Sequence, residues 1–593
     1  MMHDDPSPFT LRDYGLTIAM LLLGMFFVPL SVMYLDLPRI PGDLVDARLN
    51  NYFLEHGYKW VTGQVASFWS APFFFPAPQV MTLSDNHLGT LSLYSLFRIL
   101  NFDRETAYQL WMLALFALNY LCAVVVLNRM RFNPVGAAAG AYFFTFSLPM
   151  SAQLGHIQLL PRFMIPLAFY FALRFLEQKK TRDLVATCAC VVVQFYCVIY
   201  VGYFLSLGLV FFFVSYLMLA RDRMEIRAVL WGSRKELSER VLAVVGSGAA
   251  LMPLMYPYYL RSMDSEPNSW EVISWMLPRA RSYFYTFNES LTWRWLSRVE
   301  NGLPMAHEHR LFMGLLPLLA LMLVPLLWIR VPHWRLTRIG KLFSLTLLGT
   351  ILLPLYVDGV SAYRLIYSAP GINAIRAPVR IILMQSFLVA VLVALAVTFL
   401  ASLLKDRPAS VKTILAGALL ILMICDQGLV HPDRLSYNKA EAQSRARAVE
   451  ELVLARDPQA KLFLYLPSKP DEERAVRNLD AMLAAQSMGI FTVNGHSGYE
   501  PRDNRPDPRK PNFCSHLQEW FVFAKAYYRD LDHIDLLDHL LVVGDHSFIG
   551  GRSDSGRSGM DTGGVSERAK VEGVRGGGGR IDTWKGKSYH PVK

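Results

Sequence analysis

Two aspartates, Asp43 and Asp46, follow the first long apolar run of the chain within a few residues. A carboxylate at the edge of a membrane can serve as a general base toward an acceptor hydroxyl, or can orient that hydroxyl. Asp43 also has a structural reading, because Gly42-Asp43 precedes a predicted helix and aspartate commonly caps a helix N-terminus. Asp46 lies inside that helix, where capping explains it less well. We predict that one of the two aspartates is the catalytic base, and the choice between them stays open.

Further polar side chains continue along the same helix and return near the far end of the same loop. Arg48, Asn50 and His56 extend the polar surface beyond Asp46, although a plain solvated helix face would carry similar residues. Asp85 and His87 stand in the run 84–87, where we expect Ser84 or Asp85 to cap a short helix that begins at Leu88. We predict that five of these side chains contact substrate: Arg48, Asn50, His56, Asp85 and His87.

Two later segments add polar groups beside apolar runs. His156 and Gln158 stand in a very short loop, and polar groups held so close to a bilayer are often functional. The alternative for His156 is a solvated side chain in a tight turn. Glu308 is either a second acid/base group or a carboxylate at a helix start. We count these three among the substrate-binding residues. No close spacing of His, Cys and carboxylate residues predicts a metal site, and we expect no cofactor.

Three arginines are the candidates for binding a phosphate group. Arg376 and Arg380 are four residues apart at the start of an apolar run, and Arg364 comes shortly before them. Arginine presents a planar fork of donors that matches phosphate oxygens. The alternative is that these residues anchor the protein to anionic lipid headgroups.

The elements that must position these residues are membrane helices. The chain has 593 residues, of which 53% are hydrophobic and only 18% are charged, whereas a soluble protein has about 25% charged residues. The apolar residues gather in runs long enough to cross a bilayer as helices. We predict a polytopic α-helical membrane protein with eleven spans: 14–35, 105–127, 136–151, 158–176, 183–200, 202–220, 240–259, 311–329, 341–357, 379–401 and 410–430.

The loops between the predicted spans alternate in character. One set is short and rich in Lys and Arg, which places it in the cytoplasm together with the N-terminus. The net charge of +11 is therefore explained by these loops and does not predict nucleic-acid binding. The other set is predicted to face outward and consists of 36–104, 152–157, 260–310 and 358–378. It holds most of the candidate residues, and Gln158 and Arg380 lie within the first two positions of the adjoining spans.

Two outer parts of the chain have structure of their own. In the first outer loop, 46–64 and 88–100 are predicted helices that lie at the membrane interface without spanning it. After the transmembrane domain (1–430), residues 431–549 form a predicted small α/β domain on the outer face. Its elements are helices over 440–454, 472–486 and 512–529 and strand-like stretches over 461–466, 490–493 and 540–543. Residues 550–593 are rich in Gly, Ser and Arg and are predicted to be disordered.

This arrangement resembles the GT-C superfamily of integral-membrane glycosyltransferases, and within it bacterial proteins such as the YfhO-like group. The segments that carry the resemblance are 42–48, 155–158, 308–314, 370–380 and 494–499. The resemblance implies a polyprenyl-phosphate sugar as donor and an acidic residue of the first outer loop as base, a position that Asp43 or Asp46 matches. The chain lacks the adjacent Asp-Glu pair of the protein O-mannosyltransferases. It also lacks the Trp-Trp-Asp motif of the oligosaccharyltransferases, so protein N-glycosylation is not expected.

We therefore expect a hexosyl- or pentosyltransferase of the bacterial inner membrane. It would transfer a sugar from a polyprenyl-phosphate donor to an extracytoplasmic glycan, lipid or protein. Two other hypotheses stay open, a transporter or flippase of lipid-linked glycans and a non-catalytic assembly protein on the same scaffold. A transporter should show internal repeats and charges at mid-membrane, and neither pattern is evident in the sequence.

Overall fold

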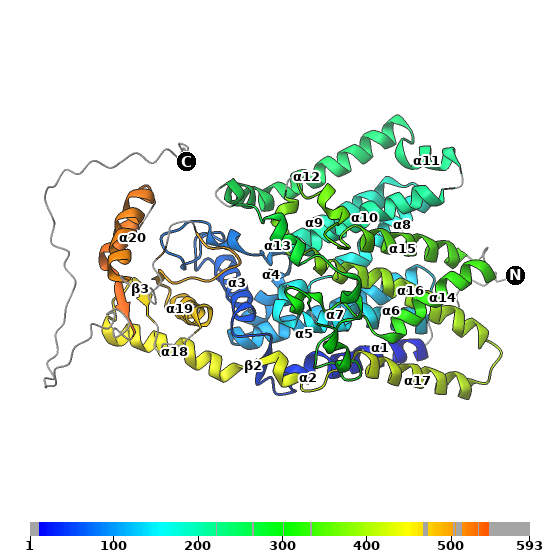
Figure 1. Cartoon of the computed structure of the whole chain (residues 1–593), viewed down its shortest axis with the longest axis horizontal. Helices are drawn as coiled ribbons and strands as arrows, with labels where there is room; N and C mark the ends of the chain where they lie inside the picture. The colour runs from blue at the N-terminus through cyan, green and yellow to red at the C-terminus, as the bar shows by residue number, and fades with distance from the viewer. Residues whose placement is uncertain are drawn as a thin grey trace. The chain divides into compact units, whose positions relative to one another are not determined.

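The computed structural model describes residues 11–544, apart from 221, 264–265, 301, 332–334, 370, 467–472, 502–504, 506–512 and 532. The tail over 550–593 that we predicted to be disordered lies outside the described residues. The described part of the chain forms one compact unit, and Figure 1 shows that it consists mainly of helices.

Every predicted span coincides with a helix, although two of the spans are broken. The first is interrupted at Val28, before Pro29, and the third between Thr145 and Leu148. The helices at these positions are α1 (Leu11–Phe27), α2 (Pro29–Met33), α5 (Arg104–Arg129), α6 (Pro134–Thr145), α7 (Leu148–Ala152), α8 (Met164–Gln178), α9 (Thr181–Cys197), α10 (Ile199–Leu219), α12 (Arg234–Met263), α14 (Leu315–Arg330), α15 (Arg335–Leu352), α16 (Ile382–Leu403) and α17 (Ala409–Gln427).

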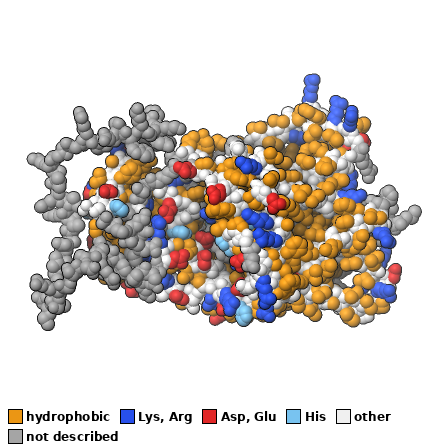
Figure 2. All heavy atoms as spheres, in the orientation of Figure 1, with side chains coloured by type: hydrophobic (Ala, Val, Ile, Leu, Met, Phe, Trp, Pro, Cys, Tyr) orange, Lys and Arg blue, Asp and Glu red, His pale blue; other side chains and the backbone are white. Residues whose placement is uncertain are grey.

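Six helical segments of the described chain are long and apolar enough to cross a membrane, and the helix α14 is apolar but shorter. The integral membrane character of the protein is therefore confirmed, while the count of eleven spans stays a prediction. In Figure 2, hydrophobic side chains cover most of the surface of the part that holds these helices.

The helix α16 is the centre of the membrane part, because every residue from 382 to 396 is buried. The helix α6 packs closely against it through two glycines. A Cβ atom on Gly140 would lie 2.5 Å from the carbonyl oxygen of Ala390, and one on Gly136 would lie 2.6 Å from that of Ala394. Small residues four positions apart allow two membrane helices to approach at backbone distance. This packing fixes the helix whose outer end carries Arg380.

The first outer loop contains the two predicted helices, as α3 (Asp46–Val61) and α4 (Leu91–Ile99). We expected α3 to lie at the membrane interface, with a plain solvated polar face as the alternative to substrate contact. Instead every residue from 47 to 57 is buried, because α4, α5 and the later helix α19 pack around α3. The alternative of a plain solvated face is therefore wrong for this part of α3.

The C-terminal region contains the predicted α/β elements. They are α18 (Lys439–Arg456), β3 (Leu462–Tyr465), α19 (Arg474–Met488), β4 (Phe491–Thr492), α20 (Phe513–Tyr527) and β5 (Leu541–Val543). The strands form a parallel sheet in the order β4-β3-β5, with Leu462 opposite Phe491 and Phe463 opposite Leu541. Parallel neighbours need crossover connections, and α19 supplies the one between β3 and β4.

This region shares its apolar core with the first outer loop. Phe53 and Phe73 from the loop are buried in one cluster with Leu464 and Met482 from β3 and α19. A short antiparallel pair, β1 (Arg39–Pro41) with β2 (Ser436–Asn438), also joins the end of the first span to the start of the C-terminal region. The boundary predicted at residue 431 therefore separates two regions along the sequence, whereas in space the first outer loop and the C-terminal region pack as a single body.

The other described helices lie in the loops. They are α11 (Arg223–Leu230), α13 (Trp270–Trp275) and a series of short 3-10 helices, of which four carry candidate residues: η3 (Leu154–Leu159), η6 (Ala306–His309), η7 (Ala362–Leu365) and η9 (Pro378–Ile381).

Candidate active site

Four predicted site residues from four separate elements meet at one place. Asp46 Oδ2 lies 3.3 Å from His156 Nε2, and Glu308 Oε1 lies 3.9 Å from the same nitrogen. Arg380 donates two hydrogen bonds to Glu308, from Nε to Oε2 at 2.9 Å and from Nη2 to Oε1 at 2.5 Å. We call these four residues the Asp46 cluster. They come from α3, η3, η6 and η9, which are remote from one another in sequence.

Asp43 organises the chain that leads into the cluster. Its Oδ1 accepts hydrogen bonds from the backbone N–H groups of Val45 (3.0 Å) and Asp46 (2.7 Å), and so holds the turn that begins α3. Gly42 has φ +101°, and a Cβ atom there would lie 2.8 Å from Ala47 Cβ and 3.1 Å from Leu154 O. Only glycine allows this close approach. It brings the first turn of α3 against η3, which carries His156.

The protonation states in the cluster follow from burial and from the neighbouring charges. Burial, helped by the negative charge of Asp43, raises the pKa of Asp46 to about 6, against the opposing effect of Arg380 and Arg376. Burial and the positive charge of Arg380 lower the pKa of His156 to about 3. Burial disfavours the charged form of Glu308, but Arg380 outweighs it and holds the pKa of Glu308 well below its usual range. At neutral pH the cluster therefore contains two carboxylates, a neutral imidazole and one guanidinium.

A second set of predicted residues forms a hydrogen-bonded chain beside the cluster. Asn50 donates from Nδ2 to Gln158 Oε1 at 2.9 Å and to the carbonyl oxygen of Asp46 at 2.7 Å. Its Oδ1 lies 2.8 Å from His87 Nε2. Burial lowers the pKa of His87 to about 4, so its imidazole is neutral and Nε2 carries the proton that Asn50 accepts. The chain connects the first turn of α3 to both neighbouring loops.

The three arginines differ in what they contact. Arg380 is almost fully buried and is engaged with Glu308, and its guanidinium also lies over the Tyr200 ring. Arg376 has an exposed side chain, its backbone N–H donates to Tyr200 Oη at 3.0 Å, and its charge lowers the pKa of Asp46. Arg364 is exposed and lies over the Trp270 ring, 5.5 Å from the ring centre. No described contact joins Arg364 to the Asp46 cluster.

Three further predicted residues have contacts of a structural kind. Arg48 is 3% exposed and its Nη2 lies 2.5 Å from Asp480 Oδ1, which ties α3 to α19. His56 is buried, with Nε2 3.1 Å from the carbonyl oxygens of Ser67 and Phe68. Asp85 Oδ1 accepts the backbone N–H of Ile199 at 2.9 Å. The prediction that these three bind substrate stays untested.

The helix that we expected Ser84 or Asp85 to cap begins differently. Asn86 Oδ1 accepts the backbone N–H of Leu88 at 2.9 Å, whereas Asp85 holds the first residue of α10. Burial raises the pKa of Asp85 to about 6, although the backbone N–H groups that it accepts oppose this. The expected cap at Leu88 is therefore wrong by one residue, because Asp85 has a partner on a distant helix that local sequence does not reveal.

Sequence reasoning missed two side chains at the rim of this region. Tyr200 lies between Arg376 and Arg380, as described above. Asn268 donates from Nδ2 to Tyr499 Oη at 3.0 Å and to the carbonyl oxygen of Asn373 at 2.9 Å. The segment 494–499 therefore contacts a loop of the membrane part through Tyr499. Neither Tyr200 nor Asn268 has a local motif that could have identified it.

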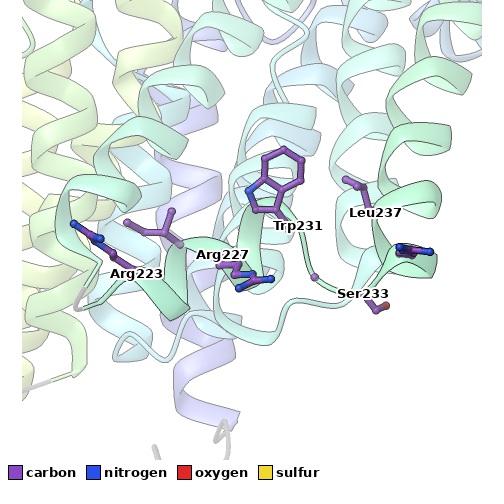
Figure 3. A pocket seen from close by; sticks show the side chains of 8 residues that line it. Arg223, Arg227, Trp231, Ser233 and Leu237 are labelled. Carbon is purple, nitrogen blue, oxygen red and sulfur yellow. The ribbon is translucent and has the colours of Figure 1, made fainter.

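Two further observations complete the description. Among the described residues, no group of three or more His, Cys, Asp and Glu side chains is placed to hold a metal ion. A cavity of about 560 Å³ lies elsewhere, between α11 and the start of α12 (Figure 3). We call it the α11–α12 groove, and its lining residues are Arg223, Ile226, Arg227, Trp231, Gly232, Ser233, Arg234 and Leu237.

The chain matches no protein-family model and no curated protein, but it is similar to several solved structures. The oligosaccharyltransferase of Archaeoglobus fulgidus in the apo form has a TM-score of 0.50 at 10% identity, over 86% of this chain and 68% of the archaeal one. The arabinofuranosyltransferase AftD from Mycobacteria has a TM-score of 0.44 at 14% identity, over 79% of this chain and 30% of that one. ArnT from Cupriavidus metallidurans, bound to undecaprenyl phosphate, has a TM-score of 0.41 at 12% identity, over 82% and 90%.

All three are GT-C membrane glycosyltransferases. At 10% identity, the likeness to the archaeal protein shows a shared fold. The chain has the GT-C fold, as the sequence resemblance implied.

Proposed function

We propose that the protein is a membrane glycosyltransferase that uses a polyprenyl-phosphate sugar, with Asp46 as the catalytic base. The observation that carries the proposal is the meeting of Asp46 Oδ2 with His156 Nε2 at 3.3 Å, beside the Glu308–Arg380 pair, on a GT-C fold. We place this site on the outer face of a bacterial inner membrane, with the N-terminus in the cytoplasm, as the basic loops predict.

The proposed step is a single displacement. Asp46 removes the proton from an acceptor hydroxyl, and the hydroxyl oxygen forms a bond to the anomeric carbon of the sugar. The bond between that carbon and the phosphate oxygen breaks, and polyprenyl phosphate leaves with the electron pair. The anomeric configuration inverts. A base with a pKa of about 6 is mostly ionised at neutral pH and is still basic enough to assist proton transfer.

The environment of Asp46 favours it over Asp43 for this role. Asp43 Oδ1 is occupied by two backbone N–H groups that begin α3. The side chain of Asp46 is 36% exposed, so an acceptor can reach it. His156 is neutral and lies beside Asp46, where it can orient the carboxylate or the acceptor hydroxyl.

We propose that Arg376 is the main residue that binds the phosphate of the donor. Its side chain is exposed while its charge acts on Asp46, which places a guanidinium within reach of the same substrate. Positive groups aimed at the leaving phosphate stabilise the charge that develops on it. Arg380 uses Nε and Nη2 on Glu308, and we propose that it contributes its charge and holds Glu308 beside His156. Asn50, His87 and Gln158 are proposed to support the first turn of α3.

The test is a transfer assay in membranes with labelled polyprenyl-phosphate sugars. Loss of a general base costs about 10²- to 10⁴-fold in rate, so Asp46→Asn should lose most activity. Arg376→Gln should raise the donor concentration needed for half-maximal rate, and Arg364→Gln is the matched control that should retain activity. If Asp46→Asn is folded and fully active, Asp46 is not the base. If the wild-type protein transfers no labelled sugar, a transport or assembly role replaces the enzyme.

A further inference from the structure

The α11–α12 groove presents three arginines without counter-charges. Arg223, Arg227 and Arg234 line it, and all three side chains are exposed. Within the described part of the chain, none of the three guanidiniums has an ion-pair or hydrogen-bond partner. Figure 3 shows Arg223 and Arg227 on the same side of the groove as Trp231. A cavity with three uncompensated cations on its wall favours an anion.

The carboxylates nearest in sequence are already engaged. Glu225 lies 2.7 Å from Arg338 Nη2 and accepts a hydrogen bond from Tyr216. Glu236 Oε2 accepts the backbone N–H of Ser233 at 2.8 Å, and Asp222 Oδ1 accepts that of Glu225 at 2.8 Å. In these contacts each of the three acids engages a partner other than the arginines of the groove.

The backbone of the groove is held in place from α12. Arg240 donates from Nη1 to the carbonyl oxygens of Ala228 (3.1 Å) and Val229 (2.9 Å), at the C-terminal end of α11. Gly232 has φ +56°, and a Cβ atom there would lie 2.6 Å from Glu236 Oε2. The turn between the two helices is therefore built closely and needs glycine.

The groove lies at the opposite end of α12 from the first outer loop. Near the other end of that helix, Tyr258 Oη donates to the carbonyl oxygen of Ser84 at 2.8 Å. The helix from residue 234 to residue 258 is about 36 Å long, which exceeds the hydrocarbon thickness of about 30 Å. The groove is thus at the membrane surface opposite the Asp46 cluster, the side that the basic loops predict to be cytoplasmic.

Apolar side chains surround the three arginines. Trp231 is 58% exposed and Met224 is 80% exposed, and Ile226 and Leu237 line the groove. Tryptophan beside arginine at a membrane surface suits a ligand with one charged and one apolar end. Figure 2 shows Lys and Arg side chains gathered over this end of α12, next to a hydrophobic surface.

We propose that the α11–α12 groove binds the phosphate headgroup of an anionic phospholipid in the leaflet opposite the candidate active site. The guanidiniums bind the phosphate oxygens, and Trp231 packs on the upper part of the acyl chains. The proposal is independent of the reaction proposed for the Asp46 cluster.

The test uses the full-length protein in proteoliposomes that contain brominated phosphatidylglycerol or brominated phosphatidylcholine, because bromine quenches nearby tryptophan. The Trp231 signal is obtained as the difference between the wild-type protein and Trp231→Phe. We expect stronger quenching by phosphatidylglycerol. The triple variant Arg223→Gln, Arg227→Gln, Arg234→Gln should need a much higher mole fraction of this lipid, about fivefold per arginine and roughly a hundredfold in all.

A charge-matched variant is the control, with Arg129→Gln, Arg182→Gln and Arg407→Gln in other loops predicted to be cytoplasmic. It should quench like the wild-type protein. Equal quenching by the two lipids, or unchanged quenching in the triple variant, would overturn the proposal. If the two lipids quench equally while inorganic phosphate changes the Trp231 fluorescence of the wild-type protein and not of the triple variant, the groove is a site for free phosphate and the lipid assignment is wrong.

Discussion

The Glu308–Arg380 pair should set the pH at which the protein begins to work. Asp46 and Glu308 lie 3.3 and 3.9 Å from the same nitrogen of His156, so their nearer oxygens are at most about 7 Å apart. With the effective dielectric constant of about 20 that applies near a protein surface, one unit charge at this distance is worth about 2 kcal/mol. Because the Asp46 side chain is 36% exposed, solvent reduces this to an effect of about one pH unit on its pKa.

The two partners of the pair should shift the pH profile in opposite directions. In the wild-type protein the rate should fall about tenfold per pH unit below about pH 6, because Asp46 becomes protonated and can no longer accept the proton. Glu308→Gln leaves Arg380 without its counter-charge, which favours the carboxylate form of Asp46 and moves the midpoint to lower pH. Arg380→Gln leaves Glu308 without its partner and moves the midpoint to higher pH.

The assay is the initial rate of sugar transfer at saturating acceptor, measured from pH 5 to pH 8 for each variant. Glu500→Gln is a suitable control, because it removes one partner of a surface ion pair, with Arg474, and should leave the midpoint unchanged. The reasoning is refuted if the Glu308→Gln profile coincides with that of the wild-type protein or shifts to higher pH. An unshifted profile in all variants would mean that Asp46 is not the titrating base.

Three further predictions concern stability. Arg48→Ala should lower the free energy of unfolding by about 3–5 kcal/mol, because it leaves the buried Asp480 with Arg445 as its remaining described ion-pair partner. Thermal unfolding in detergent measures this change. A large loss of activity at unchanged stability would instead indicate that Arg48 contacts substrate. Asn50→Ala should cost about 1–3 kcal/mol because it removes the partner of buried His87 and of half-buried Gln158. A neutral effect in the same unfolding assay would show that this hydrogen-bonded chain does not contribute to stability. Gly140→Val should destabilise the packing of α6 on α16 by about 1–3 kcal/mol or more. Gly417→Val is the matched control, because nothing lies within 4 Å of a Cβ added at Gly417, and it should destabilise much less. Equal melting temperatures for the two variants would contradict the close packing.

Much of the fold was predictable because its signals are local. Apolar runs of bilayer length located the membrane helices, and the predicted helix over 46–64 begins in the structure at Asp46, after the turn that Asp43 holds. Alternation of apolar residues and the intervening helices located β3 and β4. The resemblance predicted which loops supply the candidate residues.

The pairing of side chains could not be predicted in the same way, because it depends on contacts between distant elements. Arg48 is 432 residues from Asp480, and nothing near Arg48 in the sequence indicates that it is buried rather than solvated. Arg380 and Glu308, which we assigned to different roles, are partners across 72 residues. Asp85 was a candidate cap for the helix at Leu88, yet its side chain accepts the backbone N–H of Ile199, the first residue of α10, 114 residues away. In each case the residue type indicated that the side chain has a specific role, but the sequence did not identify its partner.

The core that the first outer loop shares with β3 and α19 has a consequence for biogenesis. Phe53 and Phe73 leave the ribosome about 400 residues before Leu464 and Met482, which complete their burial. In the predicted topology, these side chains lack their partners from β3 and α19 until the last membrane helices have inserted and the C-terminal region has crossed the membrane, and long-range contacts of this kind form late. The turn that carries Asp46 should therefore mature after synthesis has finished. Nascent chains that stop before β3 should remain protease-sensitive in the first outer loop even when their membrane helices are fully inserted.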